Sequence, residues 1–310
     1  MECGLRLHHR HRASTGSLPL VSIITVVLNG AGTIEKCITS VLNQTYDNIE
    51  YIIIDGGSSD DTTNVISKYC DNIDYAISEP DSGIYNAFNK GISLASGDYI
   101  IVLNSDDWYA KDAIALLVKG ALRSGSDITH ANVYTVFDNG SVNSIMKGWL
   151  HDGLYTRGMP IRHETMLTKK SVYERFGYYD EKYKIISDYD YLISLYTGGC
   201  SFKHINKELL YFRTSGVSHK DAANRFTERK MIFGELFPFL DTSDLDLMAR
   251  YGKMSHKLRI YFIKKYLSKR SASRLVRSMI YNLVFSIVED VLKPITVVRN
   301  VIRARLVQHK

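Results

Sequence analysis

Two adjacent aspartates, Asp106 and Asp107, follow an apolar run at 98–103. The run predicts a buried strand, so both carboxylates would lie at its carboxyl end, where open α/β sheets bind ligands. Carboxylate oxygens suit Mg²⁺ or Mn²⁺, and a diphosphate can supply the remaining ligands. The pair therefore predicts a divalent-metal site. The alternative is a solvated helix start, where carboxylates are favoured near the helix N-terminus.

Asp55 closes a second apolar run, 49–54, and precedes a Gly-Gly-Ser-Ser-Asp-Asp turn. At the end of a buried strand its carboxylate could accept hydrogen bonds from the base or ribose of a nucleotide. It could equally be the first cap of the turn that follows it, a common role for aspartate. The residues leave both interpretations open.

Asp188 and Asp190 lie at the start of a predicted helix over 186–197. We expect Ser187 to be the N-cap, with Asp190 three residues later in a weak capping box. Asp188 could instead project from the helix mouth and accept a proton from an attacking hydroxyl group. The local pattern alone favours capping.

Two histidines, His163 and His219, are flanked by polar residues in Arg-His-Glu-Thr and Ser-His-Lys. Either could ligate a metal or contact a phosphate. Simple solvation is the alternative for a lone histidine in a loop.

The elements that must position these residues alternate between strands and helices. Apolar runs predict strands at 21–28, 49–54, 73–78 and 98–103, and helical spacing separates them; the helix after the third strand is expected to bury Ile84, Ala87, Phe88, Gly91, Ile92 and Ala95. Stacked β-α units of this kind indicate an α/β fold with a mainly parallel sheet. Three of the loops that follow strands are acidic or polar.

The second half of the chain is less regular. It predicts a strand at 129–137, a loop and strand at 159–170, the helix at 186–197 and a pair of strands within 200–212. Beyond about residue 220 the pattern is helical. The expected organisation is a polar N-terminal tail over 1–18, a main domain over 19–220 and a basic helical region over 221–310.

The formal charge of +6 is unevenly distributed along the chain. Residues 251–310 contain 14 lysines and arginines but only two acidic residues, Glu289 and Asp290. Lys264, Lys265, Lys269 and Arg270 alternate there with apolar residues, which suits an anionic membrane surface. A solvated basic helix is the alternative. A nucleic-acid partner is not expected, since the main body is acidic and carries no nucleic-acid motif.

Composition indicates a globular protein with no apolar run long enough to span a membrane. The first 17 residues lack the apolar segment of a secretory signal, so we expect a cytoplasmic location. Four scattered cysteines, Cys3, Cys37, Cys70 and Cys200, suggest a reducing compartment, and disulfides are not expected. Phosphate-loop and dinucleotide-binding motifs are absent, which argues against kinase-like and dinucleotide-binding folds.

Several segments in order resemble the family 2 glycosyltransferases of the GT-A fold. The likeness rests on the first strand with Asn29, a Ser-x-Leu-x-Gln-Thr-Tyr segment at 40–46, the Asp55 turn, and Ser-Glu-Pro-Asp-Ser-Gly-Ile-Tyr-Asn-Ala from 78. The last segment is similar to the exopolysaccharide branch that includes colanic acid transferases. The resemblance covers roughly residues 20–218.

The resemblance implies a role for each matching residue. Asp55 would contact the nucleotide base, Asp106 the ribose or the metal, and Asp107 the metal that bridges the diphosphate, while Asp188 would deprotonate the acceptor hydroxyl. It also implies a nucleotide-sugar donor, with uridine diphosphate favoured, a glycan or lipid-linked acceptor, and inversion at the transferred sugar. Further donor or metal contacts are expected from Asn29, Asp81, Lys90 and His219.

Two positions depart from the family pattern. Asn104 stands where the metal motif often begins with aspartate, and Gly56 replaces a second aspartate after the second strand. Asn104 puts the strictness of the metal requirement in question. It also keeps open a catalytically inactive relative that acts as a binding or scaffold subunit, against which the presence of all four aspartates argues.

Overall fold

The computed structural model describes the chain except residues 11, 15–17, 147–158, 215–220 and 252–310. Three predictions therefore lie outside the described residues. They are the role of His219, the basic helical nature of the C-terminal region beyond 251, and its membrane contact.

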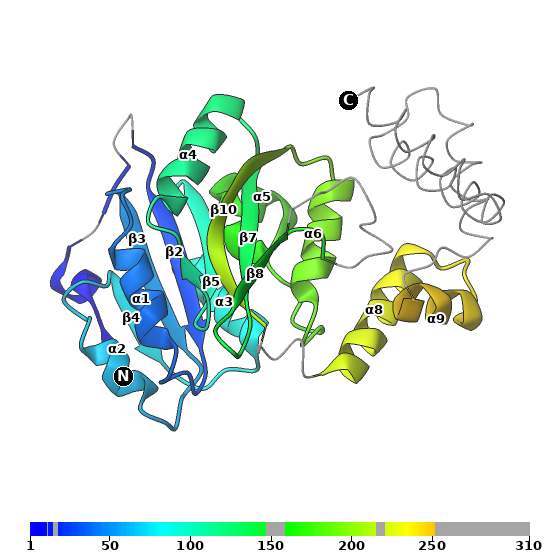
Figure 1. Ribbon diagram of the computed structural model, residues 1–310, viewed down its shortest axis with the longest axis horizontal. Helices are drawn as coiled ribbons and strands as arrows, with labels where there is room; N and C mark the ends of the chain where they lie inside the picture. The colour runs from blue at the N-terminus through cyan, green and yellow to red at the C-terminus, as the bar shows by residue number, and fades with distance from the viewer. Residues whose placement is uncertain (11, 15–17, 147–158, 215–220, 252–310) are drawn as a thin grey trace. The chain divides into compact units, whose positions relative to one another are not determined.

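Ten strands form one mixed sheet within the described residues, in the order β1-β4-β3-β2-β5-β9-β7-β10-β6, with β8 beside β7 (Figure 1). Its parallel centre confirms the four predicted strands, β2 (Val21–Val27), β3 (Ile49–Asp55), β4 (Tyr75–Ser78) and β5 (Tyr99–Asn104). Every residue of β2 and β3 is buried, as expected for strands covered on both faces.

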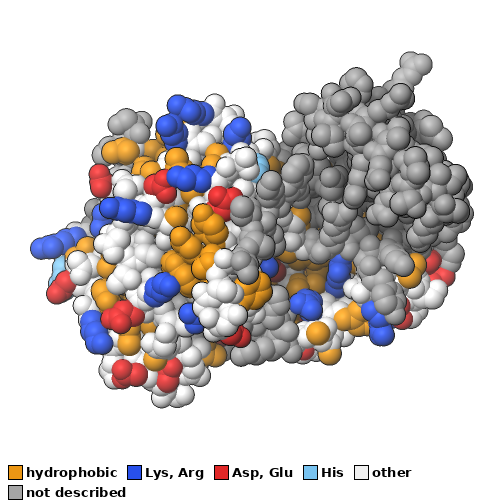
Figure 2. Space-filling view, viewed as in Figure 1, with side chains coloured by type: hydrophobic (Ala, Val, Ile, Leu, Met, Phe, Trp, Pro, Cys, Tyr) orange, Lys and Arg blue, Asp and Glu red, His pale blue; other side chains and the backbone are white. Residues whose placement is uncertain are grey.

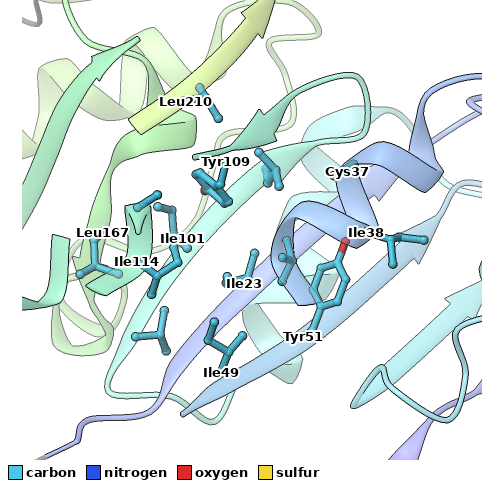
Figure 3. Close-up of a cluster of buried hydrophobic side chains, with 14 of the residues drawn as sticks. Ile23, Cys37, Ile38, Ile49, Tyr51, Ile101, Tyr109, Ile114, Leu167 and Leu210 are labelled. Carbon is cyan, nitrogen blue, oxygen red and sulfur yellow. The ribbon is translucent and has the colours of Figure 1, made fainter. Parts of the chain in front are cut away.

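Helices cover both faces of this parallel centre. On one face, Ile23 and Tyr51 pack in a single core with Cys37 and Ile38 of α1 (Ile34–Leu42) and with residues of α4 (Ala113–Ser124) (Figure 3). On the other face, α3 (Ile84–Leu94) approaches β2 so closely that a Cβ atom at Gly91 would collide with Ile24. Alternate side chains of β2 therefore point into two different cores.

The predicted helices form with small shifts in their ends. The helix after β3 is α2 (Thr62–Ser67), which is a short helix of little more than one turn. In α3 the expectation for Ile84 is wrong, because Ile84 is 41% exposed at the first helical position and Tyr85 occupies the buried place instead.

The second half completes the sheet with β6 (Trp108–Tyr109), β7 (Ile128–Val136), β8 (Val142–Met146), β9 (Leu167–Lys169) and β10 (Phe202–Arg213). The strand pair expected at 200–212 is wrong: β10 is a single strand parallel to β7, and its register shifts between Ile205 and Leu210. That irregularity carries polar residues, which explains why the sequence suggested a turn. Helices α5 (Lys170–Phe176) and α6 (Ser187–Thr197) and the short η2 (His163–Thr165) join these strands.

The N-terminal residues take part in the fold. Strand β1 (Glu2–Cys3) pairs antiparallel with β4, and η1 (Leu5–His8) follows it. This pairing brings Cys3 to a Cα–Cα distance of 5.6 Å from Cys70, and the two form a disulfide. The expectation of no disulfide is therefore wrong. The two cysteines are 67 residues apart, so no local sequence pattern indicates that they pair.

The C-terminal helices described are α8 (Ala222–Leu236) and α9 (Thr242–Tyr251). Of the described residues, those within 161–229 form one compact unit together with the N-terminal part of the chain, and 230–251 belong to a second unit. No helix in the described part is long and apolar enough to cross a membrane. Acidic and basic side chains are both spread over the described surface seen in Figure 2.

Candidate active site

The loops that follow β2 and β3 are tied together at the carboxyl edge of the sheet. Asn29, at a positive φ of 51°, accepts a hydrogen bond on Oδ1 from the Ser59 amide at 2.9 Å. The backbone N–H of Asn29 donates a hydrogen bond to the Ser58 hydroxyl at 2.7 Å. Asn29 thus joins the two loops, and its predicted contact with the donor stays a prediction.

Asp55 is fully buried at the end of β3 and is surrounded by donors. Its carboxylate accepts hydrogen bonds from the Ser58 amide at 3.0 Å and the Ser78 hydroxyl at 2.6 Å, and the Ser58 hydroxyl also donates to it. Asp55 therefore caps its turn, one of the two roles that the sequence left open. The nucleotide contact stays a prediction.

Asp81 fills the space beside Gly56. A Cβ atom at position 56 would collide with the Asp81 carboxylate, whose other oxygen accepts the Gly83 amide at 2.9 Å. Lys90 reaches the same loop from α3, where its Nζ lies 2.7 Å from Glu79 Oε1 and 3.2 Å from the Pro80 carbonyl. The missing aspartate at 56 thus makes room for an acidic side chain from the next loop.

Asp107 is the most constrained acid of the pair that follows β5. Only 1% of it is exposed, its Oδ1 accepts the Arg213 amide at 2.8 Å, and its Oδ2 has no hydrogen-bond partner among the described residues. Burial, and then the charges of Glu164 and Asp106, raise its pKa well above the usual value. Asp106 is half-buried beside it.

Glu164 is a buried acid that sequence reasoning missed. It is 1% exposed, and Asn104 donates a hydrogen bond from Nδ2 to its Oε1 at 2.8 Å. The departure at 104 thus has a physical reason: an aspartate there would oppose a second buried carboxylate, whereas the amide donates to it. The only signal in the sequence was its place next to His163.

His163 lies between the buried Glu164 and Asp188 and contacts both carboxylates. Its Nδ1 lies 3.1 Å from Asp188 Oδ2, and its Nε2 lies 3.5 Å from Glu164 Oε1. The ring of Phe88 packs edge-on against the imidazole at 5.7 Å. Burial lowers the pKa of His163, but the charge of Glu164 and the hydrogen bond to Asp188 outweigh it, so the pKa is raised.

Asp188 is held on both oxygens. Besides His163 on Oδ2, the Tyr85 hydroxyl lies 3.0 Å from Oδ1. Burial raises the pKa of Asp188, but the hydrogen bond and charge of His163 and the hydrogen bond of Tyr85 produce a net lowering. The lowered pKa favours the ionised carboxylate, the contacts of His163 and Tyr85 orient it, and 15% of the side chain remains exposed.

The capping box predicted for this helix is wrong. The N-cap is Ile186, Ser187 is the first helical residue, and its hydroxyl has no hydrogen-bond partner among the described residues. Asp188 and Asp190 lie in the first turn, where the helix dipole favours carboxylates. Asp190 is half-buried, and its predicted place in the site stays a prediction.

The residues at the end of β5, together with Glu164 of η2, fit a divalent cation that is shared with a ligand. Within the described part of the chain, no three His, Cys, Asp or Glu side chains are grouped closely enough to hold a metal by themselves. However, Asp107 Oδ2, Glu164 Oε2 and Asn104 Oδ1 are buried acceptor atoms without hydrogen-bond partners in the described residues. A cation would compensate this charge, and a diphosphate would complete its ligands.

Comparison with known sequences identifies the family. Residues 22–187, more than half of the chain, match the family model of glycosyl transferase family 2, and the chain belongs to this family. It is 36% identical over 233 residues to the chondroitin synthase of Pasteurella multocida strain Pm70, covering 73% of this chain and 23% of that protein. It is 37% identical over 198 residues to a hyaluronan synthase of Pasteurella multocida, covering 61% of this chain and 20% of that protein. The chain thus spans only about a quarter or less of these relatives.

Solved structures show the fold. S. aureus TarS 1–349 in complex with UDP-GlcNAc superposes with a TM-score of 0.58 and 16% identity, covering 74% of this chain and 70% of that one. The mannosyltransferase PcManGT from Pyrobaculum calidifontis, in complex with GDP-Man and Mn²⁺, gives a TM-score of 0.55 and 13% identity, covering 90% and 91%. The predicted GT-A fold, the family and the glycosyltransferase class are therefore confirmed.

Proposed function

We propose that this chain transfers a sugar from a nucleotide-sugar donor to a glycan or lipid-linked acceptor in polysaccharide synthesis, with Asp188 as the general base. The observation that carries the proposal is the contact between Asp188 and His163. It gives an ionised, partly exposed carboxylate. It also connects that carboxylate, through Glu164 and Asn104, to the loop of Asp106 and Asp107.

The donor is proposed to lie along the carboxyl edge of the sheet. Asp55 ends β3, Asn29 and Asp81 lie in the loops after β2 and β4, Lys90 lies on α3, and Asp106 and Asp107 follow β5. UDP-GlcNAc in TarS and GDP-Man in PcManGT show that proteins of this fold bind nucleotide sugars. We favour a uridine diphosphate donor.

Asp107 and Asp106 are proposed to hold the divalent cation, Mn²⁺ or Mg²⁺, with Glu164 close by. The cation, when bound, would offset the charge that develops on the departing nucleoside diphosphate. PcManGT binds Mn²⁺ together with GDP-Man in its complex, which supports this choice.

In the proposed reaction the acceptor hydroxyl oxygen forms a bond to the anomeric carbon while the bond from that carbon to the diphosphate oxygen breaks. The hydroxyl proton passes to Asp188, and the bonding electrons leave with the nucleoside diphosphate. Attack from the face opposite the leaving group inverts the anomeric centre. His163 and Tyr85 hold the Asp188 carboxylate in one orientation, so little reorganisation is needed as the proton moves.

A direct test is donor turnover by the full chain with and without an acceptor. We expect release of nucleoside diphosphate from one member of a panel of UDP- and GDP-sugars in Mn²⁺, faster when an oligosaccharide acceptor is added. The same panel should raise the melting temperature only for the donor that is used. Donor binding without any turnover would favour the inactive binding subunit instead.

The basic residues of 251–310 are proposed to bring the chain to an anionic membrane surface that carries a lipid-linked acceptor. The support is the charge pattern of the sequence, 14 basic against two acidic residues. Flotation with anionic and neutral vesicles tests this, because only the anionic vesicles should retain the chain, and added salt should release it.

A further inference from the structure

We propose that Glu228, on α8, is a positioning residue that holds the loop carrying Asp188. The inference rests on the proposed function, since it concerns the base of that reaction. It assigns a role in the site to the helix that follows residues 215–220, a part of the chain that the sequence suggested was a separate appendage.

Glu228 accepts hydrogen bonds from three successive backbone amides. The Lys184 amide lies 2.6 Å from Oε1, and the Ile185 and Ile186 amides lie 2.9 Å and 3.0 Å from Oε2. Only 8% of Glu228 is exposed. A buried carboxylate is costly unless donors surround it, and here both oxygens receive amide hydrogens. The carboxylate therefore fixes three consecutive peptide units.

The helix that carries Asp188 has no side-chain cap hydrogen bond of its own, so no local side chain fixes its start. The N-cap Ile186 offers no side-chain hydrogen bond, and the Ser187 hydroxyl has no hydrogen-bond partner among the described residues. Glu228, from a distant part of the chain, accepts the amide of the N-cap Ile186 and the amides of the two residues before it, so it fixes the segment that leads into the helix. Unpaired amides at a buried helix start would cost free energy and leave the loop free to adopt other conformations.

The fixed peptides lead directly to the base. Ile186 precedes Asp188 by two residues, and the Tyr85 hydroxyl lies 2.9 Å from the Ile185 carbonyl as well as 3.0 Å from Asp188 Oδ1. Glu228 thus holds the amide side of the loop while Tyr85 contacts its carbonyl side. A shift of the loop would move Asp188 relative to His163 and Tyr85, the two groups that hold its carboxylate.

The test compares Glu228→Gln and Glu228→Asp with the wild-type full chain. Glu228→Gln keeps the shape, but its NH₂ group would face an amide hydrogen and lose at least one hydrogen bond. We expect kcat for transfer to fall by about 10- to 100-fold, the size of effect caused by small misplacements of reacting groups. The donor dissociation constant, measured by calorimetry, should stay near the wild-type value. Glu228→Asp, which keeps the charge, should recover part of kcat.

Glu174→Gln is the matched control, because it removes the same charge from an exposed position on α5. Wild-type kcat in both Glu228 variants would overturn the proposal, even if their melting temperatures fell. Equal losses in donor affinity and kcat, or failure of both variants to fold, would also overturn it, since Glu228 would then be a general stability residue. Absence of transfer by the wild-type chain would instead refute the proposed function.

Discussion

The Nδ1 atom of His163 lies 3.1 Å from Oδ2 of Asp188, although the two residues come from different elements of the irregular second half of the chain. The sequence marks each of them as a candidate site residue, but it does not show that they are in contact. Together they form an ion pair in which each partner favours the charged form of the other, because the pKa of His163 is raised and that of Asp188 is lowered.

Asp188→Asn should abolish most transfer and leave donor binding largely intact. The amide keeps the shape of the carboxylate but cannot take the acceptor proton, and general-base catalysis commonly contributes about 10²- to 10⁴-fold. Steady-state transfer and calorimetric donor titration measure the two effects. Asp138→Asn, at an exposed turn, is the control. Full activity in the Asp188 variant would reject this residue as the base.

His163→Gln should make the melting temperature less dependent on pH. Because the pKa of His163 is raised in the folded chain, His163 stabilises the fold fully below its unfolded pKa of about 6.5. This stabilisation is lost as pH rises through the folded pKa. The lowered pKa of Asp188 means that its contribution is present above about 3.8 and is lost as pH falls through the folded value. The difference between wild type and variant should therefore be largest near pH 5 to 6. A difference that is constant from pH 5 to 9 would contradict the ion pair.

Asp107→Ala should weaken the binding of both Mn²⁺ and the donor. The raised pKa of Asp107 also means that metal must displace a proton at low pH, so the Mn²⁺ affinity of the wild-type chain should increase as pH rises. Calorimetry with Mn²⁺ and nucleoside diphosphate across pH checks both effects, with Asp138→Ala as the control. Transfer that is insensitive to a chelator would argue against the metal role.

Asn104 and Glu164 should behave as a complementary pair. Asn104→Asp alone places a second carboxylate against Glu164 and should destabilise the fold by about 1–3 kcal/mol, the cost of an unsatisfied buried polar group. Adding Glu164→Gln restores one donor and one acceptor and should recover most of the loss. Urea unfolding of both single variants and the double variant gives the coupling energy. Additive effects would show that the contact between them carries no stability.

Cys3→Ser should lower the free energy of unfolding by about 2–4 kcal/mol under oxidising conditions, the usual contribution of a disulfide. The substitution removes the covalent bond between β1 and Cys70, which lies between α2 and β4, so only the strand pairing with β4 holds β1 there. Reductant should lower the melting temperature of the wild-type chain but not that of the variant. Equal sensitivity of both proteins would show that the disulfide does not form in solution.

The regular first half of the fold could be predicted from the sequence because local patterns determine it. The apolar runs before Asp55 and Asp107 are covered on both faces, so strand and loop could be placed without knowing their partners. The carboxyl ends of parallel strands lie at one edge of the sheet. The sequence therefore also predicted that Asp55, Asp106 and Asp107 lie along that edge.

The contacts that complete the site depend on residues far apart in sequence. Glu164 meets Asn104 across 60 residues, and Glu228 meets Ile186 across 42, so no periodicity records either contact. Tyr85 was not predicted for another reason: the helical pattern placed Ile84 in the core, but Ile84 is exposed at the first helical position and Tyr85 is buried.

The contact between Gly56 and Asp81 limits which substitutions position 56 can accept in this chain. A side chain at 56 would require the Asp81 carboxylate to move, because the Asp81 oxygens occupy the space beside Gly56. Exchanging the two residue types together should be tolerated far better than introducing the acid at 56 alone.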